Sequence, residues 1–395
     1  MKTLKQSPLD PGFVQNPYAT YAEILQDDDP VRFWQDYGKV AVFDAASVQS
    51  LLRDRRLGRA MPAHLKASTP PHLADFAALE EVSMLELEPP VHTRLRRLVL
   101  RAFTSSRIAH LEPDIHAICD MLLAKLPKGR FDLLPAYCAP LPVRVIARLL
   151  GVPEAASCDL LRWSNAMVAM YQAGRTKQIE VAANEAAAAF TAFLSGHIDA
   201  RRKTPGQDLL SELIKAEEDG QKLTRQELIG TAILLLNAGH EATVHTLGNA
   251  VKTLLETRRP WQTITEAVVE EILRFDPPLH VFNRFVYEPV SVGPHRLEPG
   301  QEIMLVLGAA GHDPRAVSNP AVFTPSRPSV PHAAFGGGLH FCVGAPLARL
   351  ELKIGLQRLF EAFPDLQMEE PTRYANSYHF HGLETLIVST GTRAL

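Results

Sequence analysis

The 395-residue sequence has no apolar run of membrane-spanning or signal-peptide length and no paired cysteine spacing. No stretch of about 18 uncharged apolar residues occurs, so we predict no membrane-spanning helix. The N-terminal segment up to Tyr18 carries prolines and polar residues without an apolar core of signal-peptide length. The four cysteines, Cys119, Cys138, Cys158 and Cys342, have no paired spacing, which fits a reducing compartment. We therefore expect a soluble, cytoplasmic protein.

An excess of charge of one sign is missing as well. Lys and Arg number 41 and Asp and Glu number 44, so the formal net charge of −3 gives no indication of a nucleic-acid partner. Hydrophobic residues make up 46% of the chain and charged residues 22%, which is typical of a globular protein with a large core. Because one-core enzymes reach this length, we predict a single domain over residues 1–395. We also expect a monomer.

Helical periodicity dominates the chain and predicts a mainly α fold with a small β region. Apolar residues on either side of a turn at 36–39 predict a hairpin over 31–44, and further strands are expected at 284–308. Residues 58–90, with several prolines and weak periodicity, are expected to form a long functional loop. The β-rich part thus covers about 30–45 and 284–308, and the helical core covers about 92–275 and 345–362, with periodic segments at 107–126, 141–150, 157–172, 178–202, 207–218, 225–256 and 264–275.

The most informative run of residues is FGGGLHFCVG, at 335–344. Gly336 and Gly338 permit positive φ and a close approach of the backbone to a flat group. A predicted helix starts at Ala345, and its positive end would stabilise a thiolate at Cys342. The run is suited to presenting one sulfur ligand to a metal.

Two other interpretations of Cys342 remain at this point. It could be a small buried hydrophobic residue, the commonest role of a single cysteine, although the glycines and His340 would then be unexplained. Zinc could also be held by His332, His340 and Cys342, but a structural zinc site needs four ligands and no second cysteine is near.

The pattern F-G-x-G-x-H-x-C-x-G resembles the haem-binding loop of cytochrome P450 monooxygenases. The resemblance implies the cytochrome P450 fold, with Cys342 as the iron ligand of haem b and Phe335, Gly336 and Gly344 against the cofactor. A thiolate ligand favours cleavage of the O–O bond of dioxygen. By the same resemblance, the haem propionates are bound by His92, Arg96, Arg284 and His340.

A long central helix is predicted from Thr224, which opens a capping box with Glu227, to about Glu256. Inside it, the run AGHEAT at 238–243 resembles the P450 oxygen-activation motif A-G-x-[D/E]-T. The resemblance implies that this segment takes part in catalysis. The candidate catalytic residues are Ala238, Gly239, Glu241 and Thr243. Gly239 alone would indicate close helix packing, but beside the resemblance at Cys342 we expect it to give oxygen room through a local opening of the helix. Ala242 stands where the family usually has threonine, so Glu241, Thr243, a water or a substrate hydroxyl must supply protons.

Glu271 and Arg274 lie at i, i+3 on a predicted helix and share one face. They match the E-x-x-R of P450s, a structural ion pair behind the haem loop, and Arg327 would be the third member.

The resemblance also implies an apolar substrate pocket and a redox partner. The pocket residues would be Phe76, Met84, Leu85, Met167, Met170, Leu234, Val281 and Phe282, with His280 and His379 adding polar contacts. A basic patch of Arg94, Arg97, Arg101 and Arg107 would face solvent and dock an acidic ferredoxin that carries electrons from NAD(P)H.

The function implied is monooxygenation: insertion of one atom of O2 into a hydrophobic small organic substrate. Two alternatives stay open. Ala242 suggests a peroxide-driven or otherwise specialised haem-thiolate enzyme, and a non-catalytic haem-binding sensor is the other.

Overall fold

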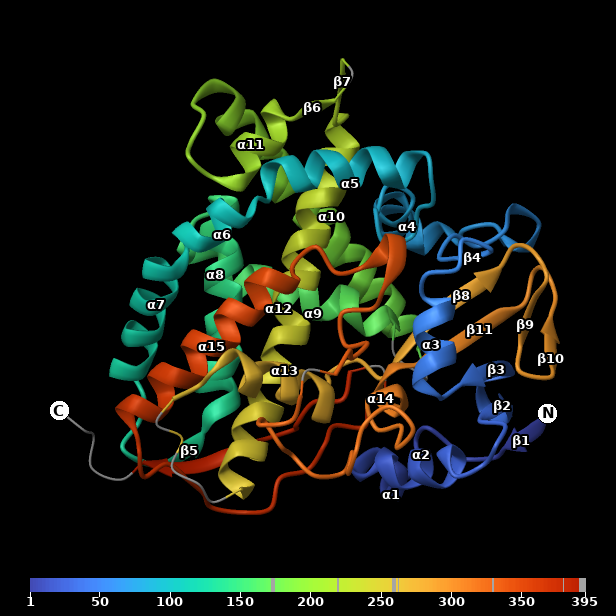
Figure 1. Cartoon of the computed structure of the whole chain (residues 1–395). Helices are drawn as coiled ribbons and strands as arrows, with labels where there is room; N and C mark the ends of the chain where they lie inside the picture. Colours follow the sequence, from blue (N-terminus) through green and yellow to red (C-terminus); the bar gives the residue numbers. More distant parts are fainter. Residues whose placement is uncertain are drawn as a thin grey trace.

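The computed structural model describes residues 1–171, 175–218, 220–257, 261, 263–328, 330–378 and 380–390. A large helical body lies beside a smaller β-rich part that contains the N-terminus (Figure 1). The predicted mainly α fold with a small β region is therefore confirmed. Within these residues, every helix is either too short or too polar to serve as a membrane span.

The helices follow the periodic segments of the sequence. The predicted long helix at 225–256 has these bounds in the structure. The helices are α1 Pro11–Gln15, α2 Pro17–Leu25, α3 Ala45–Leu51, α4 Ala74–Glu80, α5 Val91–Ala102, α6 Ser105–His110, α7 Glu112–Ala124, α8 Pro140–Leu150, α9 Ser157–Val168, α10 Lys177–Lys203, α11 Leu209–Lys215, α12 Arg225–Glu256, α13 Glu266–Phe275, α14 Leu307–Ala310 and α15 Ala345–Ala362.

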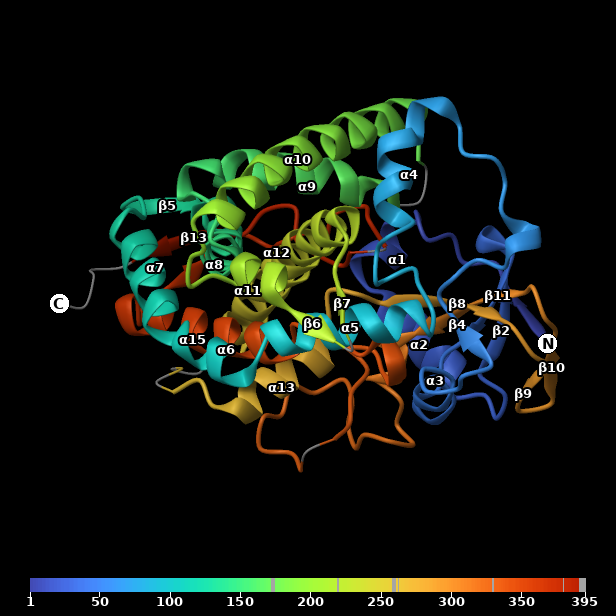
Figure 2. The same cartoon turned by 90° about the horizontal axis from the view of Figure 1, so that it is seen from above.

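Helix α12 starts where the sequence predicts because its capping box is formed on both sides. The Thr224 hydroxyl accepts a hydrogen bond from the amide of Glu227 at 3.2 Å, and the Glu227 carboxylate accepts one from the amide of Thr224 at 2.8 Å. The helix then crosses the middle of the body, with α9 and α10 on one side and α15 on the other (Figures 1 and 2).

The largest sheet has the strand order β1-β2-β3-β11-β8-β4. Strands β2 and β3 form the predicted hairpin, with Val31 opposite Val42, and Gly38 takes a left-handed φ of 61° in the turn. The strands are β1 Lys2–Leu4, β2 Val31–Trp34, β3 Lys39–Val42, β4 Leu57–Gly58, β5 Gly129–Asp132, β6 Glu217–Glu218, β7 Gln221–Lys222, β8 Val281–Val286, β9 Val290–Val292, β10 His295–Leu297, β11 Glu302–Val306, β12 Gln367–Met368 and β13 Ile387–Thr390.

Two features were not predicted. The segment 58–90, expected to be a loop, contains α4, whose Phe76 and Leu79 are buried in the main core. A second sheet joins β5 to the C-terminal strands β12 and β13. Both depend on contacts between segments far apart in the chain, which local periodicity does not reveal.

Candidate functional site

The loop 335–344 has the backbone geometry that its glycines predict. Gly336 and Gly338 have φ values of 68° and 65°. A Cβ atom on Gly338 would lie 2.4 Å from the carbonyl oxygen of Leu52, so no larger residue fits there. The amide of Cys342 donates to the carbonyl of Phe335 at 3.0 Å, which closes the loop just before α15 begins. The sulfur is thus carried on a rigid turn at a helix N-terminus.

The Cys342 side chain is exposed, yet its charged form is desolvated. Burial within the protein raises the pKa of the Cys342 thiol, while the amides of Gly344 and Ala345 and the charges of Arg96 and Arg349 act in the opposite direction. The sulfur is therefore open to a ligand although protein atoms crowd around it. There, four groups already favour the thiolate, and a metal cation would complete its stabilisation.

The zinc interpretation of this loop does not fit the neighbouring histidines. The Nε2 atom of His332 lies 3.1 Å from the Glu270 carboxylate, and that of His340 lies 3.0 Å from the Glu88 carboxylate. Each imidazole is thus engaged by its own carboxylate rather than directed with Cys342 at a common centre. One sulfur ligand is what the loop offers.

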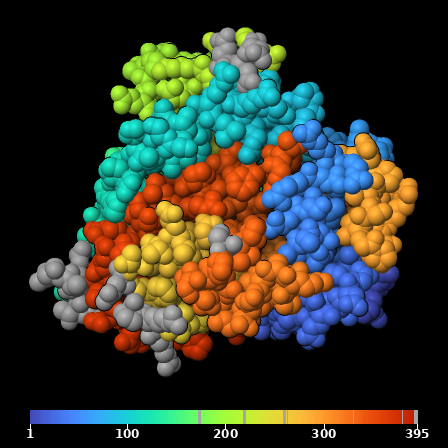
Figure 3. Space-filling view, viewed as in Figure 1, coloured from blue at the N-terminus to red at the C-terminus, as the bar shows by residue number. Residues whose placement is uncertain are grey.

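A group of buried cations and imidazoles lies beside this loop, on α5 and β8. His92 is 1% exposed, and neither of its ring nitrogens has a hydrogen-bond partner in the described residues. Its ring lies 4.5 Å from that of His340, centroid to centroid. Arg96 donates to the carbonyl of Phe341 at 2.7 Å, so α5 is tied to the residue before Cys342. Figure 3 shows α5 lying against the red segment that includes this loop and α15.

These groups are electrostatically unsatisfied. Burial and then the charge of Arg59 lower the pKa of Arg284 to about 10, and burial followed by the charge of His340 lowers the pKa of His92 to about 4. In the part of the chain that the structure describes, Arg284 forms no ion pair and donates to the Asn283 carbonyl at 2.8 Å. A buried guanidinium such as that of Arg284 requires an anionic partner, and an anionic ligand bound here would supply it.

One face of α12 carries the residues that resemble the oxygen-activation motif. Ala238 is exposed although most of the helix is buried, and Leu234, Ala242 and His245 on the same face are partly exposed. We call these four residues the α12 stripe. Glu241 lies at its edge, with its carboxylate 3.3 Å from Nε2 of His245.

Glu241 is ionised at neutral pH. Burial alone would raise the pKa of Glu241, but the hydrogen bond from His245 and the charges of His245 and His240 hold it below its usual value. The second carboxylate oxygen lies 3.5 Å from Nε2 of His240. Burial lowers the pKa of His240, whose Nδ1 meets the Leu236 carbonyl at 2.7 Å. The pair Glu241–His245 was missed in the sequence, although its i, i+4 spacing was visible.

Two expectations about this helix need correction. Helix α12 is continuous from 225 to 256, so Gly239 does not mark a local opening; a Cβ there would lie 3.0 Å from Ile146 of α8, and close packing explains the glycine. Thr243 is buried and lies half a turn away from the stripe, so it is not placed to replace a hydroxyl at Ala242. The hydroxyl of Thr246 donates to the Ala242 carbonyl at 2.7 Å.

The structure brings Glu271, Arg274 and Arg327 together. Two bonds of 2.8 Å join the guanidinium of Arg274 to the Glu271 carboxylate, and Nε of Arg327 lies 3.0 Å from both Glu271 oxygens. Arg274 also donates to the carbonyls of Gly311 and Pro320 at 2.8 and 2.9 Å. The triad thereby fixes α13 to the irregular segment that leads to the Cys342 loop.

The predicted pocket residues are distributed over several environments. Phe76, Met84, Met167 and Met170 are buried in the main core cluster, Val281 is buried in a cluster beside the N-terminal helices, Leu85 is 37% exposed, and Leu234 and Phe282 are partly buried. Leu234 is the one of these on the α12 stripe. His280 is fully buried and bonded to tyrosine hydroxyls, so it is not a pocket residue, and His379 lies outside the described residues.

Only two of the four arginines in the predicted basic patch are exposed to solvent. Arg94 forms an ion pair with Glu227 of α12, and Arg107 lies 3.7 Å from Glu212 and donates to the Gln207 carbonyl. Their side chains are 25% and 24% exposed, which contradicts the expectation that they face solvent. Arg97 and Arg101 are exposed.

Known proteins resemble the chain over nearly its whole length. The family model described as Cytochrome P450 matches residues 262–387. Cytochrome P450 monooxygenase PikC of Streptomyces venezuelae is 37% identical over 372 residues, which cover 90% of this chain and 86% of that protein. The vitamin D(3) 25-hydroxylase of Pseudonocardia autotrophica is 36% identical over 402 residues, covering 97% and 96%. P450BioI, solved in complex with a hexadec-9Z-enoic acid ligated acyl carrier protein, gives a TM-score of 0.89 at 30% identity, covering 96% of this chain and 99% of that one.

Proposed function

The chain belongs to the cytochrome P450 family and is an oxidoreductase of the monooxygenase type, and from this premise we propose how its own residues serve the reaction. The observation that carries the proposal is the desolvated Cys342 thiol beside the buried guanidinium of Arg284, which forms no ion pair in the described residues. A haem fits both: its iron accepts a thiolate, and a propionate matches the unpaired charge. When bound, haem supplies the activation of dioxygen.

Four side chains would hold that cofactor. Cys342 would ligate the iron, and Arg96, Arg284 and His92 would bind the propionates. Arg96, on α5, already donates to the carbonyl of Phe341 in the Cys342 loop. A propionate bound by Arg96 would therefore also hold this loop in place. Because Arg284 is buried without an ion pair in the described residues, its charge contributes to cofactor affinity rather than to the stability of the bare protein.

Arg284→Met is expected to weaken haem binding by about 10- to 100-fold, since a charged hydrogen bond to a carboxylate contributes about 1.5–3 kcal/mol. The free energy of unfolding of the haem-free protein should stay unchanged or rise, because an uncompensated buried charge is removed. Haem transfer to apomyoglobin and urea unfolding of the apoprotein measure the two quantities. A variant that loses apoprotein stability and keeps haem affinity would contradict the assignment.

We propose that Glu241 and His245 move protons where the usual hydroxyl is absent. A proton on Nε2 of His245 passes to the facing Glu241 oxygen across 3.3 Å, and Glu241 then holds it beside Ala242 at the edge of the α12 stripe. His245 is partly exposed and can recover a proton from water. Proton delivery by a positioned group contributes about 10²–10⁴-fold to such rates.

Glu241→Gln and His245→Phe should each lower product formation by about 10²-fold while reduction of the protein continues, so reducing equivalents are diverted to hydrogen peroxide. Product and peroxide formed per NAD(P)H consumed are the measurements. Thr243→Ala serves as the matched control, because Thr243 is buried on the opposite face of α12. It should leave the amount of product formed per NAD(P)H consumed unchanged. Equal uncoupling in Thr243→Ala and Glu241→Gln would rule out the His245 route.

The remaining proposals concern substrate and electrons. We propose a hydrophobic small organic substrate, because Ala238, Leu234 and Ala242 make the α12 stripe largely apolar. We propose a ferredoxin as donor, with NAD(P)H as the electron source and Arg97 and Arg101 on the exposed side of α5 as its contact. Salt-dependent reduction by a ferredoxin, weakened in Arg97→Glu, would support this.

Ala242 favours one second candidate, a peroxide-driven reaction that needs no proton relay. Turnover with hydrogen peroxide that exceeds turnover with ferredoxin and NAD(P)H would select it. The relatives are named as monooxygenases and hydroxylases, which argues against a non-catalytic sensor.

A further inference from the structure

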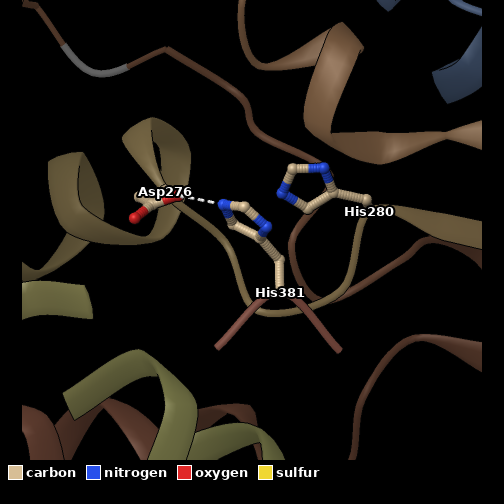
Figure 4. Close-up of side chains that lie close together, drawn as sticks. All are labelled: Asp276, His280 and His381. Carbon is tan, nitrogen blue, oxygen red and sulfur yellow. Dashed lines mark ion pairs between the residues drawn. The ribbon is translucent and has the colours of Figure 1, made fainter. Parts of the chain in front are cut away.

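Three potential metal ligands that the haem site does not use meet in the protein interior. Asp276 follows α13, His280 precedes β8, and His381 lies in the turn before β13 (Figure 4). One ligand atom from each lies within 4.8 Å of the other two. The three residues are 4%, 0% and 3% exposed, so they have been withdrawn from water together.

A fourth oxygen completes the group. The hydroxyl of Tyr18, on α2, lies 2.7 Å from Oδ1 of Asp276 and 3.3 Å from Nε2 of His280. Nε2 of His381 lies 3.4 Å from the same Oδ1. Ligands about 2.0–2.1 Å from a tetrahedral zinc ion are separated by about 3.3 Å, so two of these three spacings match and the third is shorter.

The outer atoms of the same side chains are held by other groups, and the inner atoms face one another. Nδ1 of His280 is bonded to the Tyr21 hydroxyl at 2.9 Å, and Oδ2 of Asp276 accepts a hydrogen bond from Tyr374 at 2.6 Å. The ring of Tyr374 stacks on His381 at 3.8 Å. Partners of this kind orient metal-binding histidines and carboxylates.

His381 is the least satisfied member. Its Nε2 is close enough to Asp276 for an ion pair, yet the atom has no hydrogen-bond partner of normal geometry in the described residues. A buried ring nitrogen without a partner destabilises the folded protein. The atom would be satisfied by a cation placed between the two side chains.

We propose that Asp276, His280, His381 and Tyr18 form a structural zinc site. Three atoms no more than 4.8 Å apart all lie within about 2.8 Å of a common centre, so each ligand needs to move by less than about 1 Å to reach a bond length of about 2.0–2.1 Å. Two imidazoles and a carboxylate are ligands that suit zinc. The site binds four separate segments, the N-terminal helix α2, the end of α13, the start of β8 and the C-terminal turn, and its role is to join them.

The test is elemental analysis of the haem-loaded protein, made in cells supplied with zinc sulfate and dialysed against zinc-free buffer. We expect about one zinc per chain in addition to one iron. His280→Gln and His381→Gln should each lower the zinc content at least tenfold with iron unchanged. His312→Gln is the matched control, because His312 is a buried neighbour that stacks on Tyr18 and bonds the Phe275 carbonyl.

The wild-type protein gives the decisive measurement if a variant does not fold. Zinc-edge X-ray absorption should then show nitrogen and oxygen ligands at about 2.0 Å, including two imidazoles. Wild-type protein that carries haem but no zinc, and whose melting temperature does not rise when zinc chloride is added, would overturn the proposal. The cluster would then be a hydrogen-bonded network alone. Zinc that persists in the His280→Gln/His381→Gln double variant would overturn it equally.

Discussion

Replacing Cys342 with serine is expected to abolish monooxygenase turnover. The serine hydroxyl is far less acidic than a thiol and donates less electron density to iron, so cleavage of the O–O bond loses its driving group. The surrounding donors at Gly344 and Ala345 and the charges of Arg96 and Arg349 would remain, so the loop should still fold around a cofactor. The carbon-monoxide spectrum of the reduced protein measures the ligand change, and product analysis measures the loss.

Cys158→Ser provides the control for this experiment. Cys158 is the other exposed cysteine among the residues that the structure describes, and it lies on α9. Its replacement should leave both the spectrum and turnover unchanged. Cys342→Ser protein that kept the spectrum of a thiolate-ligated iron would show that another residue is the ligand.

Removing the charge of Glu271 is expected to destabilise the protein by about 3–5 kcal/mol. Glu271→Gln leaves Arg274, which is 2% exposed, without its carboxylate, and it removes the partner of Arg327 as well. The segment leading to the Cys342 loop should loosen, so haem should be lost early in unfolding. Urea unfolding followed by haem absorbance and by circular dichroism measures both effects.

The effect should depend on pH with a defined sign. Burial would raise the pKa of Glu271, but the hydrogen bonds from Arg274 and the Thr324 amide hold it below its usual value. A lowered pKa means that the stabilisation is present above about pH 4.5 and is lost as the pH falls further. The wild type and Glu271→Gln should therefore converge in stability in acid.

Glu266→Gln is the matched control on the same helix. The Glu266 carboxylate is 89% exposed and lies 3.7 Å from the ammonium of Lys353, so its removal should change stability by less than about 0.5 kcal/mol. If Glu266→Gln lowered the free energy of unfolding by several kcal/mol, α13 would be sensitive to any substitution. The stabilising role assigned to Glu271 would then be wrong.

Features that depend on neighbouring residues were predictable. The capping box at Thr224 gave the start of α12, and the glycines of the run 335–344 gave the left-handed turns at Gly336 and Gly338. Each follows from a local conformational preference that the tertiary structure leaves in place.

Features that depend on distant partners were not predictable. No sequence feature near Arg94 indicates that it forms an ion pair with Glu227, which lies 133 residues away in the chain. Gly239 has two possible explanations in the sequence, and the contact with Ile146 decides between them. Similarly, Glu88 was not recognised as the partner of His340 because no spacing rule joins residues 252 apart.

The contact between α5 and the Cys342 loop sets an order of events during synthesis of the chain. His92 and Arg96 leave the ribosome long before Cys342, and at about 5–20 residues per second the 250 positions between His92 and Cys342 take roughly 10–50 s. During that interval α12 is made but the loop that carries Cys342 is not. With Cys342 as the proposed iron ligand, we expect a nascent chain to acquire its cofactor only near the end of translation, and a ribosome that stalls before Cys342 to leave a haem-free chain.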